Sequence, residues 1–84
     1  MARVMVRYWA AAREAAGVEQ EEVDAPTLAA VLEDVAQRRG GSLATVLARC
    51  AFLLDELPVA RRDPRDVVLR DGSVVEVLPP FAGG

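Results

Sequence analysis

The sequence S-V-V-E-V-L-P-P-F-A-G-G at residues 73–84 holds a strong β-strand signal and marks where the folded part of the chain should end. β-Branched residues are frequent over residues 73–78, and alternate positions of a strand fall on opposite faces. One face carries Val75 and Val77, and the other carries Val74, Glu76 and Leu78. The two prolines that follow cannot donate a hydrogen bond to a ladder, so the strand must end there. We therefore expect a folded domain over residues 1–78 and a flexible tail over residues 79–84.

Two further strand patterns precede the first long helix. Residues 3–9 alternate between an apolar and a polar face, which predicts a half-buried strand. Residues 18–24 carry five acids or amides around Val23, which predicts a strand near a sheet edge, where charge discourages stray pairing. The alanine-rich residues 10–16 between them predict a short helix or turn that Gly17 ends. The two strands are close enough in sequence to pair antiparallel.

The main helix is expected to begin after Thr27, whose hydroxyl can accept a hydrogen bond from a free N–H group of the first turn. Gly40 and Gly41 end it. Its apolar residues recur at helical spacing and form one stripe. Together with residues of the first and last strands, this stripe makes up the predicted core, which consists of Val4, Val6, Leu28, Val31, Leu32, Val35, Val75 and Val77.

Shorter elements complete the chain. They are a second short helix over residues 43–50 with Ser42 as its cap, a buried strand over 51–54, a turn at 55–56, a return strand over 57–60, a surface loop over 61–66 and a turn over 70–73. Strands grouped around a single long helix are typical of the α+β class. We expect one mixed sheet of about four to five strands with the main helix packed on one face.

Composition excludes several classes of function. With 84 residues the chain has room for one domain and little core to spare for a self-contained active site. A net charge of −3 disfavours a nucleic-acid binder that relies on a basic surface. Histidine and lysine are absent, which removes the commonest general base, the commonest zinc ligand and any Schiff-base amine. The short chain therefore favours a carrier, adaptor or subunit. A single cysteine, which cannot form an internal disulfide, and no apolar stretch of membrane-spanning length favour the reducing cytoplasm.

The terminal residues Gly83 and Gly84 point to that kind of role. Glycine makes up roughly 7% of residues, so a terminal pair arises by chance in about 0.5% of chains. An extended arm of four to six residues reaches roughly 13–20 Å. Prolines stiffen the base of this arm, and glycines leave its tip without side chains. Such a tip suits the insertion of a terminal carboxylate into a pocket of another protein.

The chain end resembles the small, sulfur-carrying subunit of molybdopterin synthase, within the ubiquitin-like sulfur carriers. That family commonly ends in a strand, Pro-Pro, a hydrophobic residue, a small residue and Gly-Gly, as residues 77–84 do here. Two other segments are similar to the family, namely Trp9-Ala10 with Arg13-Glu14 and Gly17, and Leu69-Arg70-Asp71-Gly72 before the last strand. The chain departs from the family pattern at Trp9, Ser73, Val74 and Phe81. None of these departures touches the Gly-Gly end.

The resemblance implies a ubiquitin-like β-grasp fold and a set of site residues. An ATP-dependent activating enzyme would adenylate the carboxylate of Gly84, and a sulfur donor would convert it to a thiocarboxylate. The tail would thread into the large subunit of molybdopterin synthase and deliver sulfur to a pterin precursor. That tail consists of Pro80, Phe81, Ala82, Gly83 and Gly84. The resemblance implies no cofactor or metal bound by this chain, no membrane or nucleic acid as partner, and no catalysis by the chain alone.

Other residues allow both a functional and a structural interpretation. Cys50 could relay sulfur, but it follows the apolar stripe of Val46 and Leu47, which favours core packing. Asp63, Asp66 and Asp71 could suggest a cation site, but their spacing fits no EF-hand loop, so a solvated loop is favoured. An acidic patch is interpreted as a solvated edge of the sheet, and it consists of Glu19, Glu21, Glu22 and Asp24.

A partner surface is the last candidate. Met5, Val74 and Leu78 would lie on the sheet face opposite the main helix and could form an apolar surface continuous with Phe81. The alternative is that loops or neighbouring side chains cover them.

Two other functions remain open at this point. One is a sulfur carrier for another pathway, such as thiamine or cysteine synthesis. The other is a ubiquitin-like modifier or interaction domain, in which Gly84 joins a protein amine or does not react.

Overall fold

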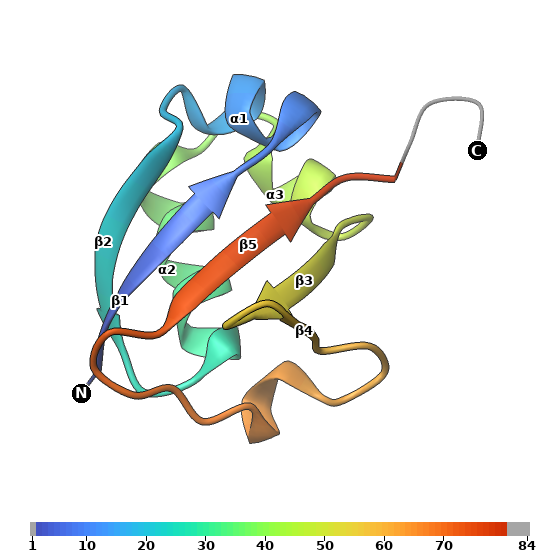
Figure 1. Ribbon diagram of the computed structural model, residues 1–84. Coiled ribbons are helices and arrows are strands. Elements are labelled where there is room, and N and C mark those ends of the chain that lie inside the picture. The colour runs from blue at the N-terminus through green and yellow to red at the C-terminus, as the bar shows by residue number, and fades with distance from the viewer. Residues whose placement is uncertain (1, 81–84) are drawn as a thin grey trace.

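The computed structural model describes residues 2–80, which form a five-stranded mixed sheet with helices packed on one face (Figure 1). This arrangement confirms the predicted α+β class. Among residues 2–80, no helix has both the length and the apolar character needed to cross a membrane. In chain order the elements are β1 (Ala2–Tyr8), α1 (Ala10–Ala16), β2 (Gln20–Ala25), α2 (Leu28–Arg39), α3 (Leu43–Leu47), β3 (Ala51–Leu54), β4 (Leu57–Pro58), the 3-10 turn η1 (Pro64–Asp66) and β5 (Val74–Leu78).

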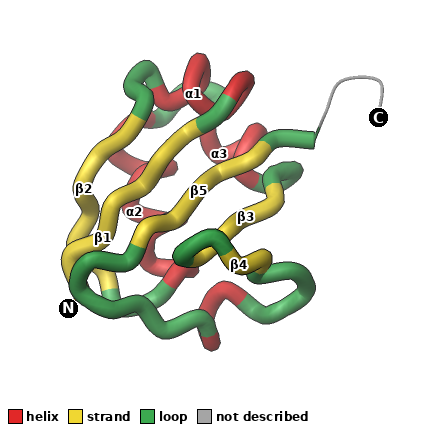
Figure 2. The backbone as a smooth tube through the Cα atoms, in the orientation of Figure 1, coloured by secondary structure: helices red, strands yellow, loops and turns green. Residues whose placement is uncertain are grey.

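The first and last strands lie side by side in the middle of the sheet. The strand order is β2-β1-β5-β3-β4, and β1 and β5 are parallel while the other pairs are antiparallel. Figure 2 shows the same order, with β2 at one edge and β4 at the other. The predicted antiparallel pairing of the first two strands is confirmed, with Val4 opposite Val23.

The helix α2 packs behind the sheet and closes the core (Figure 1). It begins as predicted, because the Thr27 hydroxyl accepts a hydrogen bond from the Ala30 N–H at 3.2 Å. Seven of the eight predicted core residues are buried, and Leu32 is half-buried against the same cluster. Tyr8, Leu43 and Val67 are further buried residues of the core.

Three local predictions were wrong. The second short helix ends at Leu47 and does not extend to Cys50. Ser42 makes no side-chain cap, because its φ of −88° and ψ of −2° are helical rather than extended, so its hydroxyl does not reach the first-turn N–H groups. The return strand β4 is also shorter than residues 57–60. Val59 still donates a hydrogen bond to the Phe52 carbonyl, but Ala60 adopts a φ of 56° and turns the chain out of the sheet.

Candidate functional site

The base of the C-terminal tail leaves the sheet at the end opposite the start of β1, because β1 and β5 are parallel. The Trp9 N–H donates to the Val77 carbonyl at 3.1 Å. This hydrogen bond joins the C-terminal end of β5 to the corner between β1 and α1. Beyond it Pro79 is half-buried and Pro80 is exposed. The other predicted tail residues, Phe81, Ala82, Gly83 and Gly84, lie outside the described residues.

The three predicted interface residues lie on the sheet face that α2 does not cover, which we call the open face. Met5 on β1 lies directly opposite Val74 on β5 in the strand register. Leu78 points to the same face from the end of β5, beside Ala51 of β3. All three side chains are half-buried, so each is part of the accessible surface. Only Leu78 lies at the base of the tail, because Met5 and Val74 lie at the start of β5 and the Arg7–Glu76 pair stands between them and the tail.

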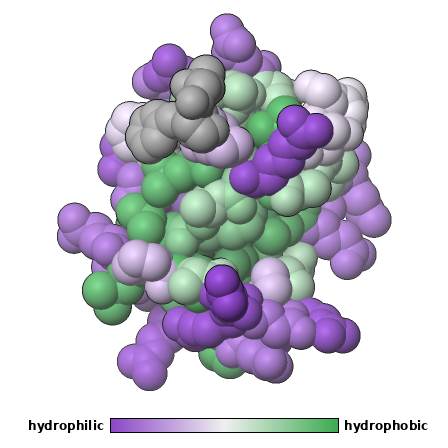
Figure 3. Space-filling view, turned by 90° about the vertical axis from the view of Figure 1, so that its right-hand side faces the viewer, coloured by the Kyte–Doolittle hydropathy of each residue, from purple (hydrophilic) through white to green (hydrophobic). Residues whose placement is uncertain are grey.

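An apolar surface continues onto the edge of the sheet formed by β3 and β4. Figure 3 looks at the right-hand side of Figure 1 and shows hydrophobic residues gathered in the middle, with hydrophilic residues above and below. Phe52, Leu53 and Leu54 are half-buried along β3, and Leu57 in β4 is 71% exposed. This apolar edge runs along β5, with Phe52 opposite Val77 near the base of the tail and Leu54, the partner of Leu57, opposite Val75 near the start of the strand.

A shallow hollow of about 310 Å³ lies on the open face beside Val74, and its polar lining consists of Arg7, Asp55, Glu56 and Glu76. Two hydrogen bonds fix one wall. The Asp55 N–H donates to the Val74 carbonyl at 2.9 Å, and the Val74 N–H donates to Asp55 Oδ1 at 2.8 Å. The turn between β3 and β4 is therefore tied to the first residue of β5.

Trp9 lies beside this hollow, with its side chain held by two neighbours. Its indole Nε1–H donates to Glu76 Oε2 at 3.0 Å, and the Arg7 guanidinium carbon lies 5.5 Å from the centre of the ring. Arg7 and Glu76 are directly opposite in the β1–β5 register. Sequence patterns alone do not identify these three side chains as neighbours. The period of two along each strand assigns them all to the open face, but the pairing of β1 with β5 was needed to make them neighbours.

Cys50 follows α3 and packs half-buried against the core, as its apolar neighbours predicted. Its Sγ–H donates to the Val46 carbonyl at 3.2 Å. Burial raises the pKa of the Cys50 thiol, so the neutral form is favoured. A sulfur relay needs the thiolate as nucleophile, and this environment works against it.

The three aspartates considered for a cation site each have separate surroundings. Asp63 pairs with Arg65 at 2.7 Å, and hydrogen bonds from Arg65 lower the pKa of Asp63 to about 2. Asp71 accepts a hydrogen bond from the Arg3 N–H at 2.8 Å, and Asp66 lies in η1. Within residues 2–80, no three His, Cys, Asp or Glu side chains are grouped as metal ligands would be. Asp66 and Asp71 are exposed and Asp63 is half-buried, so these side chains lie at the surface as the loop interpretation expects.

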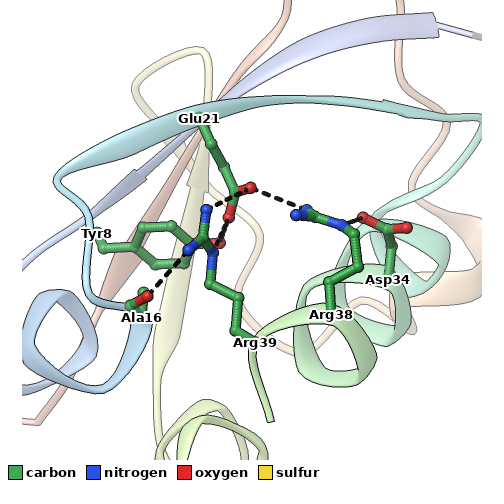
Figure 4. Close-up of polar contacts among 6 residues, drawn as sticks. All are labelled: Tyr8, Ala16, Glu21, Asp34, Arg38 and Arg39. Atoms are coloured by element: carbon green, nitrogen blue, oxygen red, sulfur yellow. Dashed lines mark hydrogen bonds and ion pairs between the residues drawn. The ribbon is translucent and has the colours of Figure 1, made fainter.

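Glu21 differs from the other members of the acidic patch, because its side chain turns toward α2 (Figure 4). It accepts hydrogen bonds from the Tyr8 hydroxyl at 2.6 Å, from Arg38 at 2.9 Å and from Arg39 at 2.8 and 3.0 Å. Burial alone would raise the pKa of Glu21, but these donors outweigh it and hold the pKa at about 2. Glu21 is thus a structural anchor of the edge strand. Glu19, Glu22 and Asp24 are exposed, as a solvated edge predicts.

Comparison with known proteins places the chain among sulfur carriers. The model of the ThiS family matches residues 6–84. The molybdopterin synthase sulfur carrier subunit of Chlamydomonas reinhardtii is 31% identical over 84 residues, which cover 98% of this chain and 99% of that protein. Both matches extend over nearly the whole chain.

Solved structures agree on the fold. Subunits 1 and 2 of the molybdopterin-converting factor from Helicobacter pylori form a complex in which a chain matches with a TM-score of 0.71 and 28% identity, covering 98% of this chain and 99% of that one. The small archaeal modifier protein 1 from Methanosarcina acetivorans matches with a TM-score of 0.85 over 100% of this chain and 98% of that one. At 21% identity, the second likeness shows the fold alone.

Proposed function

The chain belongs to the ThiS family, and from this premise we propose that it is a sulfur carrier in molybdenum cofactor biosynthesis. The observation that carries the proposal is the 31% identity to a molybdopterin synthase sulfur carrier subunit over nearly the full length of both proteins. The family match also runs through Gly84, so it includes the terminal Gly-Gly pair. A β-grasp sheet whose last strand leads directly into the tail is consistent with this role.

The proposed chemistry takes place at the Gly84 carboxylate. A terminal carboxyl has a pKa of roughly 3.3–3.7, so at neutral pH it is an anion and a poor electrophile. One of its oxygens attacks the α-phosphorus of ATP on the activating enzyme, and pyrophosphate leaves with the bonding electrons. Hydrosulfide from a sulfur donor then attacks the Gly84 carbonyl carbon. AMP leaves with the C–O electron pair, and loss of a proton gives the thiocarboxylate. Because the sulfur enters at the sulfide level, no oxidant or reductant is consumed.

The proposed partner is the large subunit of molybdopterin synthase. Pro80, Phe81, Ala82 and Gly83 would occupy its channel and place the Gly84 sulfur beside a pterin precursor. Met5, Val74 and Leu78 would dock against the same subunit, because all three are half-buried apolar residues of the open face, with Leu78 at the base of the tail. The Helicobacter pylori complex of subunits 1 and 2 supports a partner of this kind.

This chain supplies the reactive end, and its partners supply the catalytic side chains. The sequence contains no histidine and no lysine, and the only cysteine is half-buried with a raised thiol pKa. These groups are the usual sources of general-base and nucleophilic catalysis. The protein alone should therefore turn over nothing, and activity should require the activating enzyme and then the large subunit.

Intact-mass measurement tests the proposal. The chain is incubated with ATP, the activating enzyme and inorganic sulfide, and the expected product is heavier by the exchange of one oxygen atom for sulfur. A variant without Gly83 and Gly84 is the matched control, since it retains the whole sheet but should show no exchange. Addition of the large subunit and the pterin precursor should then remove the sulfur and yield molybdopterin.

The same experiment separates the other candidate functions. Exchange of oxygen for sulfur without molybdopterin formation would indicate a carrier for another pathway, such as thiamine or cysteine synthesis. Covalent attachment of Gly84 to a protein amine would instead indicate a ubiquitin-like modifier.

A further inference from the structure

The strongest unexplained feature of the open face is Trp9, whose large apolar side chain is 40% exposed at the base of the tail. Its backbone is fixed on both sides. The Trp9 N–H donates to the Val77 carbonyl, and the Trp9 carbonyl accepts from the N–H groups of Ala12 and Arg13 in the first turn of α1. The position of this residue is therefore set by β5 and α1 together.

The backbone at the next residue is strained. Ala10 adopts a φ of 48°, in the left-handed region that a residue with a Cβ rarely occupies. This conformation makes the sharp corner from β1 into α1 and lets Trp9 keep the extended backbone of the strand, with φ of −118° and ψ of 147°. Strain of this kind persists where the surrounding structure holds it, and it often accompanies functional sites.

The indole is also oriented by its side-chain contacts. Glu76 accepts the hydrogen bond from the indole N–H at 3.0 Å, and Arg7 lies 5.5 Å from the ring centre. Arg7 and Glu76 are opposite one another in the register, yet they make no ion pair within residues 2–80. Glu76 instead accepts its hydrogen bond from the indole N–H of Trp9. A side chain that is already held in one orientation loses less conformational entropy when a partner protein binds over it.

We propose that Trp9 is the aromatic anchor of the open face and that Glu76 is its positioning residue, which holds the indole ready for an apolar pocket on the partner protein. The proposal rests on the proposed function, because the partner it names is the large subunit of molybdopterin synthase. Tryptophan is enriched among residues that dominate binding energy, particularly where its apolar area enters a pocket of the partner. Trp9 follows Tyr8, the register partner of Val77, and so lies at the same end of the open face as Leu78, while the Arg7–Glu76 pair separates it from Met5 and Val74. One partner surface laid on this face would cover all four apolar residues.

Fluorescence of the free protein gives the first test, because Trp9 is the only tryptophan in the sequence. In Glu76→Ala the indole loses its acceptor, so acrylamide should quench its emission more strongly and its anisotropy should fall. In Glu76→Gln the side-chain oxygen still accepts, and both values should stay near those of the unaltered chain. Glu22→Ala is the matched control, since Glu22 is an exposed acid on the same face opposite Met5 and makes no contact with the indole. Unchanged quenching in Glu76→Ala would overturn the positioning role.

Titration with the purified large subunit gives the second test. Trp9→Ala should weaken binding by about 30-fold or more, as loss of an aromatic anchor does. Glu76→Ala should weaken it by about 3–10-fold, the range for loss of one hydrogen bond, whereas Glu76→Gln and Glu22→Ala should stay within about 2-fold.

A double-variant comparison identifies how Glu76 acts. Trp9→Phe keeps an aromatic ring but lacks the indole N–H, so adding Glu76→Ala to it should cause no further loss of affinity. An equal loss in both backgrounds would mean that Glu76 contacts the partner directly and would overturn the inference. Failure of the unaltered chain to bind the large subunit would overturn the proposed function, and the docking role of Trp9 with it. The fluorescence of the free chain would still report whether Glu76 holds the indole.

Discussion

Glu21 and Arg39 make a two-point contact between the edge strand β2 and the end of α2. Arg39 Nε lies 2.8 Å from Glu21 Oε2, and Arg39 Nη2 lies 3.0 Å from Glu21 Oε1. The Glu21 side chain is only 11% exposed. A paired arginine and carboxylate in this geometry is stronger than a typical surface ion pair. The contact joins the outer strand of the sheet to the layer of helices behind it.

Removal of this carboxylate should destabilise the protein. Glu21→Ala removes the acceptor of the buried Tyr8 hydroxyl and of two Arg39 N–H groups, so we expect a loss of about 1–3 kcal/mol in the free energy of unfolding. Urea denaturation measures it. Glu22→Ala on the same strand is the control and should change the unfolding free energy little, because that side chain is exposed. Equal effects of the two substitutions would show that Glu21 contributes nothing through its hydrogen bonds.

The same residue predicts a dependence of stability on pH. Folding lowers the pKa of Glu21 from 4.5 to about 2, so the folded state favours the ionised form. The stabilisation is complete above the unfolded pKa, and it is lost as the pH falls through the folded pKa of about 2. The stability difference between the unaltered chain and Glu21→Gln should therefore shrink between about pH 4.5 and about pH 2. Urea midpoints measured for both proteins across this range check the prediction, and a constant difference would contradict it.

The turn between β3 and β4 offers a stabilising substitution. Asp55 and Glu56 both have positive φ, 49° and 72°, as a two-residue hairpin turn of type I′ requires. Glu56→Gly removes the strain of a side chain in the left-handed region, which costs about 1–2 kcal/mol, but adds the backbone entropy cost of glycine, about 0.5–1 kcal/mol. We expect a net gain of about 0.5–1 kcal/mol, measured by thermal unfolding. Glu56→Ala keeps a Cβ and should give no such gain. If both variants melt at the same temperature, the turn is not strained.

Deletion of Gly83 and Gly84 should abolish activation of the chain and leave its thermal stability nearly unchanged. The described sheet makes its hydrogen bonds and core contacts within residues 2–80, so the melting temperature should change little. AMP formation with the activating enzyme should be abolished. An alanine added after Gly84 should be as damaging, because it moves the reactive carbonyl by roughly 3.5 Å and adds a Cβ at the tip. Activation of the shortened chain at the normal rate would refute the carrier role, whereas a much lower melting temperature would make the tail structural.

Hydrophobic periodicity predicted most of the fold, because the side chains that form the core are apolar and recur at the spacing of a strand or a helix. Val4 and Val6 on β1, and Val31 and Val35 on α2, are buried where their spacing places them. Residue types predicted the ends of helices and strands less well. Ser42 has the residue type of a cap but a helical backbone, and β4 stops early because Ala60 turns out of the sheet.

The candidate site could be predicted in part. Met5 and Val74 share the open face as the alternation indicated, since the period of two is independent of strand order. The contact of Trp9 with Glu76 could not be predicted, because 67 residues separate them and only the parallel pairing of β1 with β5 brings them together. The role of Glu21 was missed for a similar reason, since its two arginine partners lie on a helix and not on its own sheet.

The central position of β5 has a consequence for chemical synthesis. This strand joins β1 on one side and β3 on the other, and it follows an exposed polar segment over residues 61–66. A break in that segment would leave two pieces that still complement each other, because the shorter one supplies the middle strand of the sheet. A synthetic peptide covering residues 67–84 could then be mixed with the longer fragment to reconstitute the protein. The peptide could carry a thioacid already installed at Gly84, which would bypass the activating enzyme altogether.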